Sequence, residues 1–227
     1  MSSLKSIGNK FFSTSFKTYK SDHIPKGIFK ASIAPRPIGW ISSVCKSGNH
    51  NLAPFSYFNA VCDIPPTIMI STTDQHIEGG PKDTLQNIES TGHFVVNIVT
   101  QQLYEQMNLT SADLPRHTSE FDYADIKWLK SDFGESRRVE NSPIQFECKY
   151  FTSVQLPQEN KTSVNKMIIG TVIAVHVDSN ILDENGRVDY AKLKLIARMG
   201  YNDYLAINPK DIFVGKRPAA NNILPKE

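Results

Sequence analysis

The chain has 227 residues, of which 40% are hydrophobic and 21% charged, and its formal net charge is +2. No apolar run approaches the roughly 20 residues that a membrane-spanning helix needs, and no basic stripe of the kind found on nucleic-acid-binding proteins is present. We therefore expect a globular protein that interacts with neither membrane nor nucleic acid.

The cysteines and histidines suggest the compartment and argue against a metal site. Cys45, Cys62 and Cys148 are widely spaced and form no CxxC pair, and the six histidines show neither HxxxH nor HxH spacing. This pattern predicts free thiols in a reducing, intracellular compartment and no bound metal.

The N-terminal segment differs in composition from the rest. Residues 1–20 contain four lysines and no acid, and are rich in Ser, Thr and Phe, which is typical of a mitochondrial transit peptide. Because they contain no arginine and show only weak helical periodicity, a disordered or loosely docked terminus is equally compatible. We treat residues 1–25 as an extension and 26–227 as one domain of a cytoplasmic or mitochondrial protein.

A hairpin is expected near the start of the domain. Pro35 and Pro37 favour extended backbone around Arg36, residues 38–45 are typical of a strand, and Lys46-Ser47-Gly48-Asn49 predicts a turn. The returning stretch 51–59 (NLAPFSYFN) contains Pro54, which would weaken a central ladder and so favours an edge strand or bulge. A proline-interrupted core strand is the alternative.

The next elements alternate between strand and helix. A strand is predicted over 67–71, and Asp83 is predicted to cap a helix with Gln86 completing a capping box and Gly92 ending it. A buried strand at 93–99 and a short amphipathic helix at 101–107 follow.

The second half is richer in strands. Residues 109–139 carry little regular signal and predict an excursion on the surface, whereas 144–156 and 167–177 predict two long strands. A helical turn is expected over 190–195. Many strands, few short helices and short connections favour a mainly β fold, a single β-barrel domain.

One block has the character of a phosphate site. The start of the helix at Asp83 exposes unpaired N–H groups, Lys82 adds a positive charge, and Thr84 adds a hydroxyl. An ordinary capped surface helix is the alternative. Arg36 suits phosphate oxygens but is equally consistent with a surface arginine. Three hydroxyl residues that leave the preceding strand could complete the cradle: Ser71, Thr72 and Thr73.

Four sequence blocks, in this order, resemble the flavin reductase-like family of FMN-binding split barrels: APRPIGWISS (34–43), NLAPFSYFN (51–59), GPKDTLQNI (80–88) and GHFVVN (92–97). The resemblance covers roughly residues 30–217 and implies a split β-barrel with Greek-key connections. It also implies that the block at Lys82 contacts the FMN phosphate.

The resemblance implies positions for the isoalloxazine ring as well. The ring would meet Ser56, Tyr57, Phe58 and Asn59, with Asn59 as the principal side-chain partner. Phe55 is a further candidate, and for Phe55 and Phe58 a place in the core is an equal alternative. Trp40 could flank the ring, with a buried core position as the more common alternative, and Ser42 faces the same side of its strand as Trp40. Arg198 resembles a late Arg-Gly stretch that approaches the flavin or the dimer mate, although this chain has Met199-Gly200-Tyr201 there.

The function implied is NAD(P)H-dependent reduction of FMN (with FAD as a possible cofactor) by a homodimer, which passes electrons to a small-molecule or flavin acceptor. Alternatives are an FMN electron carrier without nicotinamide activity and a barrel related to pyridoxamine-phosphate oxidases or haem-handling proteins. The chain has no GxGxxG or Walker sequence, so a nicotinamide would dock directly on the flavin. No residue is identified as a catalytic acid or base.

Overall fold

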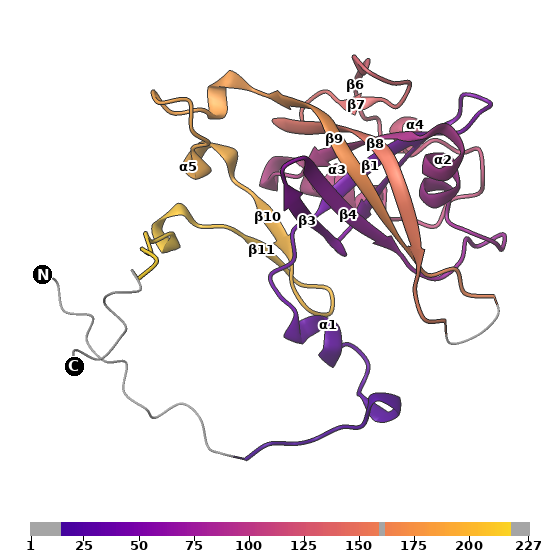
Figure 1. Ribbon diagram of the computed structural model, residues 1–227, viewed down its shortest axis with the longest axis horizontal. Helices are drawn as coiled ribbons and strands as arrows, with labels where there is room; N and C mark the ends of the chain where they lie inside the picture. The colour runs from indigo at the N-terminus through magenta and orange to yellow at the C-terminus, as the bar shows by residue number, and fades with distance from the viewer. Residues whose placement is uncertain (1–14, 159–161, 219–227) are drawn as a thin grey trace, which may run out of the picture.

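A computed structural model describes residues 15–158 and 162–218, and its centre is a seven-stranded sheet rolled into a barrel (Figure 1). Neighbouring strands pair antiparallel in the order β2-β1-β5-β8-β9-β4-β3. The strands of this sheet are β1 (Gly39–Val44), β2 (His50–Phe55), β3 (Phe58–Asp63), β4 (Pro66–Thr72), β5 (His93–Ile98), β8 (Ile144–Gln155) and β9 (Lys166–Val177).

Short elements surround the barrel. Two further strand pairs are β6 (Trp128–Leu129) with β7 (Arg138–Val139), and β10 (Ile196–Arg198) with β11 (Tyr204–Ala206). The α-helices are α1 (Ile28–Ser32), α2 (Asp83–Thr91), α3 (Tyr104–Leu109), α4 (Glu120–Tyr123) and α5 (Tyr190–Leu193). The 3-10 turns are η1 (Ser21–His23), η2 (Gln101–Leu103), η3 (Ser179–Ile181) and η4 (Pro209–Asp211). None of the helices described is long and apolar enough to cross a membrane.

The predicted hairpin of β1 and β2 is confirmed, and Pro54 lies on an edge strand as expected. The stretch 51–59 is nevertheless not one strand. β2 ends at Phe55 and β3 begins at Phe58, and these two strands are opposite edges of the sheet. Ser56 and Tyr57 therefore cross from one edge to the other, and the Ser71 N–H donates to the Tyr57 carbonyl at 2.8 Å near the crossing.

Two hydrophobic clusters lie on opposite sides of β1. Every residue of β1 is buried. Because side chains alternate along a strand, Trp40 enters one cluster and Ile41 the other. The Ile41 cluster includes Leu85 and Ile88 of α2, which packs against β1 and β2. The Trp40 cluster includes Phe121 and Val139 from the predicted surface excursion, so this segment packs on its own barrel.

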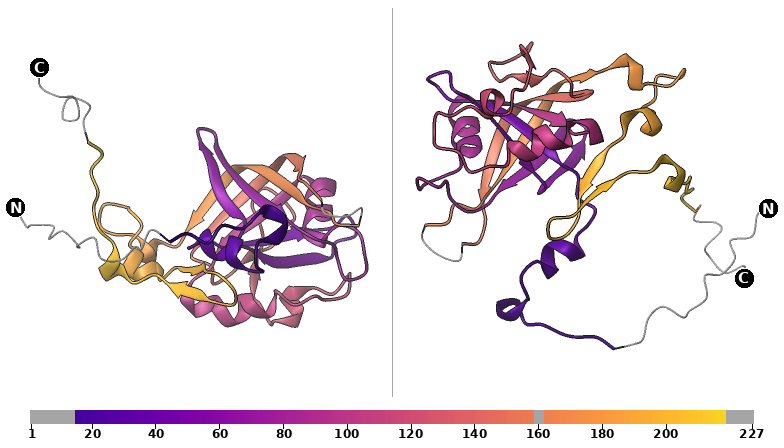
Figure 2. Two further views of the ribbon diagram at one scale, coloured as in Figure 1. Left: turned by 90° about the horizontal axis from the view of Figure 1, so that it is seen from below. Right: turned by 180° about the vertical axis from the view of Figure 1, so that it is seen from behind.

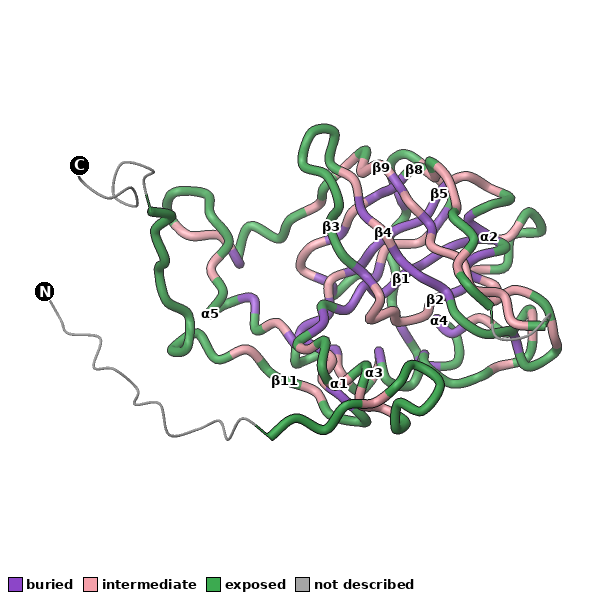
Figure 3. The backbone as a smooth tube through the Cα atoms, turned by 60° about the horizontal axis from the view of Figure 1, so that its bottom comes forward, coloured by how far each residue is buried: buried purple, intermediate pink, exposed green. Residues whose placement is uncertain are grey.

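The segments nearest the described ends lie away from the barrel (Figures 2 and 3). Residues 15–26 and 208–218 are almost entirely exposed, and they extend from the side of the molecule that carries α1 and the β10–β11 hairpin. The prediction for residues 1–20 falls mostly on residues 1–14, which lie outside the described part of the chain.

Candidate functional site

A hollow of about 160 Å³, here called the α2 hollow, lies between the end of β2 and the start of α2. It brings together Phe55 and the predicted phosphate block: Lys82, Asp83 and Thr84. The predicted capping box is wrong, because the N-cap residue is Lys82 and no side chain caps the helix. The first-turn N–H groups of α2 thus keep their partial positive charge without a capping side chain. Gly92 ends the helix as expected, in the left-handed region with its N–H on the Ile88 carbonyl.

Two ion pairs lie at the α2 hollow. Lys82 Nζ lies 3.3 Å from Asp113, and Asp83 forms an ion pair with Arg116. The Thr84 hydroxyl accepts a hydrogen bond of 2.9 Å from Asn51 Nδ2. The charges within each ion pair nearly cancel. An anion in the hollow would therefore contact the free N–H groups at the start of α2, and Lys82 could leave Asp113 to bind it. This donor set fits a phosphate monoester.

Glu120 also lines the α2 hollow. Sequence reasoning missed this residue, because it lies in a segment that was expected on the surface and has no recognisable pattern. Its side chain is buried, and Oε2 accepts the Leu52 N–H at 2.8 Å. Burial raises the pKa of this carboxyl to about 7, with a further contribution from the charge of Asp83. Near neutral pH the group therefore exchanges its proton readily, next to the proposed anion position.

A second hollow of about 390 Å³, here called the β3 hollow, holds most of the predicted ring-binding residues. Its lining includes Ser56, Tyr57, Phe58, Asn59, Ser71 and Thr73. Asn59 is exposed and its Oδ1 accepts the Ala60 N–H at 2.9 Å, which leaves the amide nitrogen without a recorded partner among the described residues. Thr72 is not part of this lining: it is fully buried, and its hydroxyl lies 3.5 Å from the Lys166 carbonyl.

Arg36 occupies a different environment from either one predicted. It is only 7% exposed, and its guanidinium donates to the carbonyls of Lys30, Ile33 (2.7 Å) and Met199 (2.8 Å) and to the Ser56 hydroxyl (3.3 Å). Four of its five N–H groups are thus engaged. It ties α1 and the β10–β11 hairpin to the end of β2, and it does not line the α2 hollow. Phosphate binding by Arg36 is therefore not what the structure favours.

Trp40 and Ser42 are also removed from the hollows. Both are fully buried; the Trp40 indole donates to the Thr110 hydroxyl at 2.9 Å, and the Ser42 hydroxyl donates to the Arg137 carbonyl. Neither side chain presents a surface to a flavin. Both lie in the core, the position that the sequence left open as the alternative for Trp40.

Arg198 lies in a third hollow of about 390 Å³, here called the hairpin hollow, between β2, α3 and the β10–β11 hairpin. Its guanidinium lies 4.4 Å from the centre of the Tyr204 ring and donates to the Tyr201 carbonyl at 2.6 Å. The hairpin hollow shares Arg36 and Ser56 with the β3 hollow, and Pro54 and Ser111 with the α2 hollow. The three hollows therefore meet around the end of β2.

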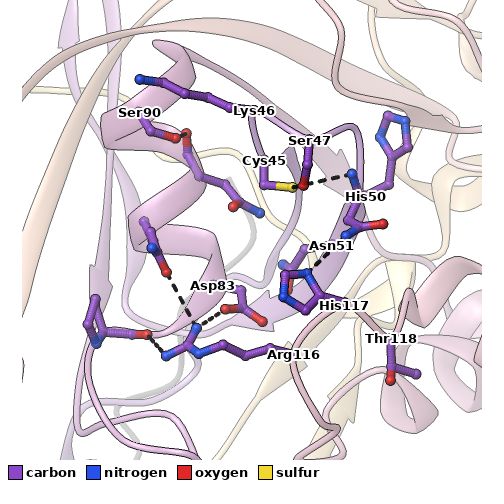
Figure 4. Close-up of a pocket in the computed structure, with 14 residues that line it drawn as sticks. Cys45, Lys46, Ser47, His50, Asn51, Asp83, Ser90, Arg116, His117 and Thr118 are labelled. Carbon is purple, nitrogen blue, oxygen red and sulfur yellow. Dashed lines mark hydrogen bonds and ion pairs between the residues drawn. The ribbon is translucent and has the colours of Figure 1, made fainter.

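A fourth hollow of about 560 Å³ lies beside the β1–β2 turn (Figure 4) and shares Asn51 and Asp83 with the α2 hollow. Arg116 and Asp83 lie at one side of it, and Cys45 lies at the other with its sulfur 3.0 Å from the Ser47 hydroxyl. Burial alone would raise the pKa of the Cys45 thiol, but hydrogen bonds from Ser47 and from nearby backbone lower it overall. Of the predicted site residues, only Asp83 lines this hollow.

One group of potential metal ligands, Asp132, Glu147 and His176, lies outside these hollows. Glu147 is fully buried and accepts the N–H groups of Asp132 (2.8 Å) and Phe133 (2.9 Å). His176 directs Nε2 to Glu147 at 2.8 Å and Nδ1 towards Asp132 at 4.0 Å. Because the two ring nitrogens face different carboxylates, the geometry is that of a bridging histidine and not of ligands converging on one ion.

Comparison with known proteins shows which family the chain resembles. Residues 31–194 match the family model described as "Flavin reductase like domain". A protein of Aquifex aeolicus (strain VF5), described as uncharacterized, is 36% identical over 76% of this chain and 85% of its own length.

Solved structures show the same arrangement of the chain. Nitrilotriacetate monooxygenase component B from Bacillus cereus aligns with a TM-score of 0.81 at 29% identity, over 88% of this chain and 100% of its own. The 2-nitrobenzoate 2-nitroreductase of Pseudomonas fluorescens aligns with a TM-score of 0.72 at 28% identity, over 88% of this chain and 91% of its own. A Shewanella frigidimarina structure described as having a split barrel domain aligns with a TM-score of 0.68 at 23% identity, over 82% of this chain and 86% of its own. The predicted mainly β, split-barrel fold is confirmed.

Proposed function

Since this chain belongs to the flavin reductase-like family, we propose that it binds FMN and accepts hydride from NADH or NADPH on the flavin. The observation that carries this proposal is the meeting of hollows at the end of β2. There, the uncapped start of α2 lies beside Phe55, and Ser56 begins the crossing to β3.

The phosphate of FMN would occupy the α2 hollow. The N–H groups at the start of α2 would donate to its oxygens, and Lys82 would exchange Asp113 for the phosphate. Asp83 remains neutralised by Arg116, so it adds little repulsion.

The isoalloxazine would lie along the end of β2 and the crossing at Ser56 and Tyr57. This backbone lies at the edge of the sheet, where groups that are not paired within the sheet can meet the polar rim of the ring. The Tyr57 carbonyl is already engaged by the Ser71 N–H, and Asn59 offers a side-chain amide nearby. The bound flavin supplies the redox chemistry, and the residues of the chain position it and the reductant. No acid or base from the chain is required by this scheme.

The names of the neighbours support a redox role without fixing the acceptor. One is a monooxygenase component and another a nitroreductase, both close to 30% identical to this chain. An FMN electron carrier that does not use nicotinamide is the second candidate within the same site. Mass analysis of the cofactor released from purified protein distinguishes FMN from FAD, and bleaching of flavin absorption by NADH or NADPH distinguishes a reductase from a carrier.

The variant Lys82→Gln tests the phosphate position. We expect FMN to bind more weakly by about 1.5–3 kcal/mol, roughly ten- to hundredfold, because a charged contact is lost, whereas riboflavin should be unaffected. Lys149→Gln, which removes an exposed lysine of β8, is the matched control. Equal weakening of both ligands would contradict a phosphate at Lys82.

We further propose that the protein is a homodimer. Alternate residues of β9 leave an apolar row exposed to solvent (Ile173, Val175 and Val177), and the outlying C-terminal segment exposes Phe213 and Val214. A second copy of the chain would cover these surfaces. Val175→Lys should lower the association constant measured by sedimentation, and Val188→Lys, the same change at an exposed valine elsewhere, should not. A monomer at all concentrations would refute the dimer.

A further inference from the structure

The hairpin hollow differs from its neighbours in charge. Three of its lining residues are cations, Lys30, Arg36 and Arg198, and none of the described residues that line it is Asp or Glu. In the α2 hollow, by contrast, Lys82 is paired with Asp113. Uncompensated positive charge in a recess raises the local concentration of anions.

The three cations are held in different ways. Arg36 is buried and four of its five N–H groups are engaged, so it contributes charge but little further hydrogen bonding. Arg198 is kept in place by the Tyr204 ring and the Tyr201 carbonyl. Lys30 is exposed, and its ammonium has no recorded partner among the described residues. Lys30 and Arg198 are therefore the groups available to an incoming anion.

The rest of the lining suits a flat molecule. Tyr201 and Tyr204 contribute aromatic rings, and Tyr204 is braced edge-on by Tyr104, with ring centres 4.9 Å apart. Ile38 and Met107, both almost completely buried, form an apolar base. Aromatic faces and an apolar base favour a planar ring, while the cations favour a carboxylate or phosphate attached to it.

The position of the hairpin hollow connects it to the flavin. Pro54 and Ser56 belong both to its lining and to the stretch proposed to face the isoalloxazine. We propose that this hollow binds the molecule that exchanges electrons with the flavin, and that this molecule is a planar ring bearing a carboxylate or phosphate, held by Lys30 and Arg198. This inference rests on the proposed function for the identity of its neighbour, but its charge selectivity can be measured without flavin.

Two pairs of probes separate charge from shape and donor from acceptor. Benzoate and benzamide represent an aromatic acceptor with and without charge. Reduced nicotinamide mononucleotide and reduced nicotinamide riboside represent the electron donor with and without its phosphate. Binding is followed by ligand-observed NMR on the flavin-free protein, and by perturbation of flavin absorption on the FMN-loaded protein under anaerobic conditions.

We expect the charged member of at least one pair to bind at least tenfold more tightly than its uncharged partner. Lys30→Gln and Arg198→Gln should each remove most of this preference, while Lys149→Gln should retain it. Thermal melting checks that each variant is folded; if Arg198→Gln does not fold, Lys30→Gln decides alone, because Lys30 is exposed.

The possible results distinguish this inference from the proposed function. Equal binding of charged and uncharged probes in both pairs, or a preference that survives Lys30→Gln, overturns the inference even if FMN binds normally. A charge preference that depends on Lys30 in a protein that binds no FMN supports the anion site and refutes the flavin assignment.

Discussion

Replacing Glu120 by glutamine tests the electrostatics of the α2 hollow. The carboxyl is 8% exposed, its Oε2 accepts the Leu52 N–H, and burial raises its pKa from 4.5 to about 7. Glutamine can keep an acceptor for that N–H but cannot ionise. The variant therefore removes one titration while leaving the packing nearly unchanged.

The sign and size of the effect follow from proton linkage. Between pH 4.5 and about 7 the unfolded chain gives up this proton while the folded chain keeps it, so stability falls as pH rises through this window. At about 1.4 kcal/mol per pH unit, the loss amounts to about 3 kcal/mol above pH 7. Glu120→Gln should therefore gain about 3 kcal/mol relative to wild type on going from pH 4.5 to pH 8.5.

Urea denaturation of both proteins at pH 4.5 and pH 8.5 measures this difference. All other titrating groups are present in both proteins, so their contributions cancel when the two are compared. Glu140→Gln, at an exposed glutamate, is the control. A stability difference between Glu120→Gln and wild type that is the same at both pH values would refute the raised pKa and the buried, desolvated state of Glu120.

The same variant tests the proposed phosphate position. A hollow of about 160 Å³ is about 7 Å across, so an ionised Glu120 would repel an anion inside it by about 2 kcal/mol per charge at an effective dielectric constant of 20. At pH 8.5, Glu120→Gln should bind FMN at least tenfold more tightly than wild type, with riboflavin unchanged. Equal affinities for FMN would place the phosphate elsewhere.

Arg36→Met should cost about 3 kcal/mol of stability in urea denaturation, because the carbonyls that Arg36 joins would lose a buried charged donor; a cost below 1 kcal/mol would contradict that role. Burial alone would raise the pKa of Glu147, but hydrogen bonds from Asp132, Phe133 and His176 lower it overall from its ordinary value of 4.5. Glu147→Gln should therefore destabilise the protein at pH 7, and its cost should shrink as the pH falls below 4.5 and through the lowered pKa, where wild type loses the same contribution; a cost that does not change with pH would refute this. Trp40→Phe should lower the free energy of unfolding by about 1–2 kcal/mol, because the hydrogen bond to Thr110 is lost, and should leave FMN affinity unchanged. Weaker FMN binding would show that Trp40 contributes to the flavin site.

Much of the local structure was predictable because short-range patterns specify it. The hairpin over β1 and β2, the helix that begins at Asp83 and stops before Gly92, and the long strands β8 and β9 all follow from periodicity, turn residues and proline. The proposed phosphate block at Lys82 depends on the same kind of pattern, since an anion site at a helix start is built from consecutive residues.

What the tertiary structure decided involves residues far apart in the chain. Arg36 meets the Met199 carbonyl 163 positions away, and Glu120 meets the Leu52 N–H 68 positions away. Ser56 and Tyr57 form a crossing only because β2 and β3 become opposite edges of one sheet. Local patterns describe which backbone a segment favours, but the partner of a buried charge is set by how the sheet closes, and closure depends on pairing between distant strands.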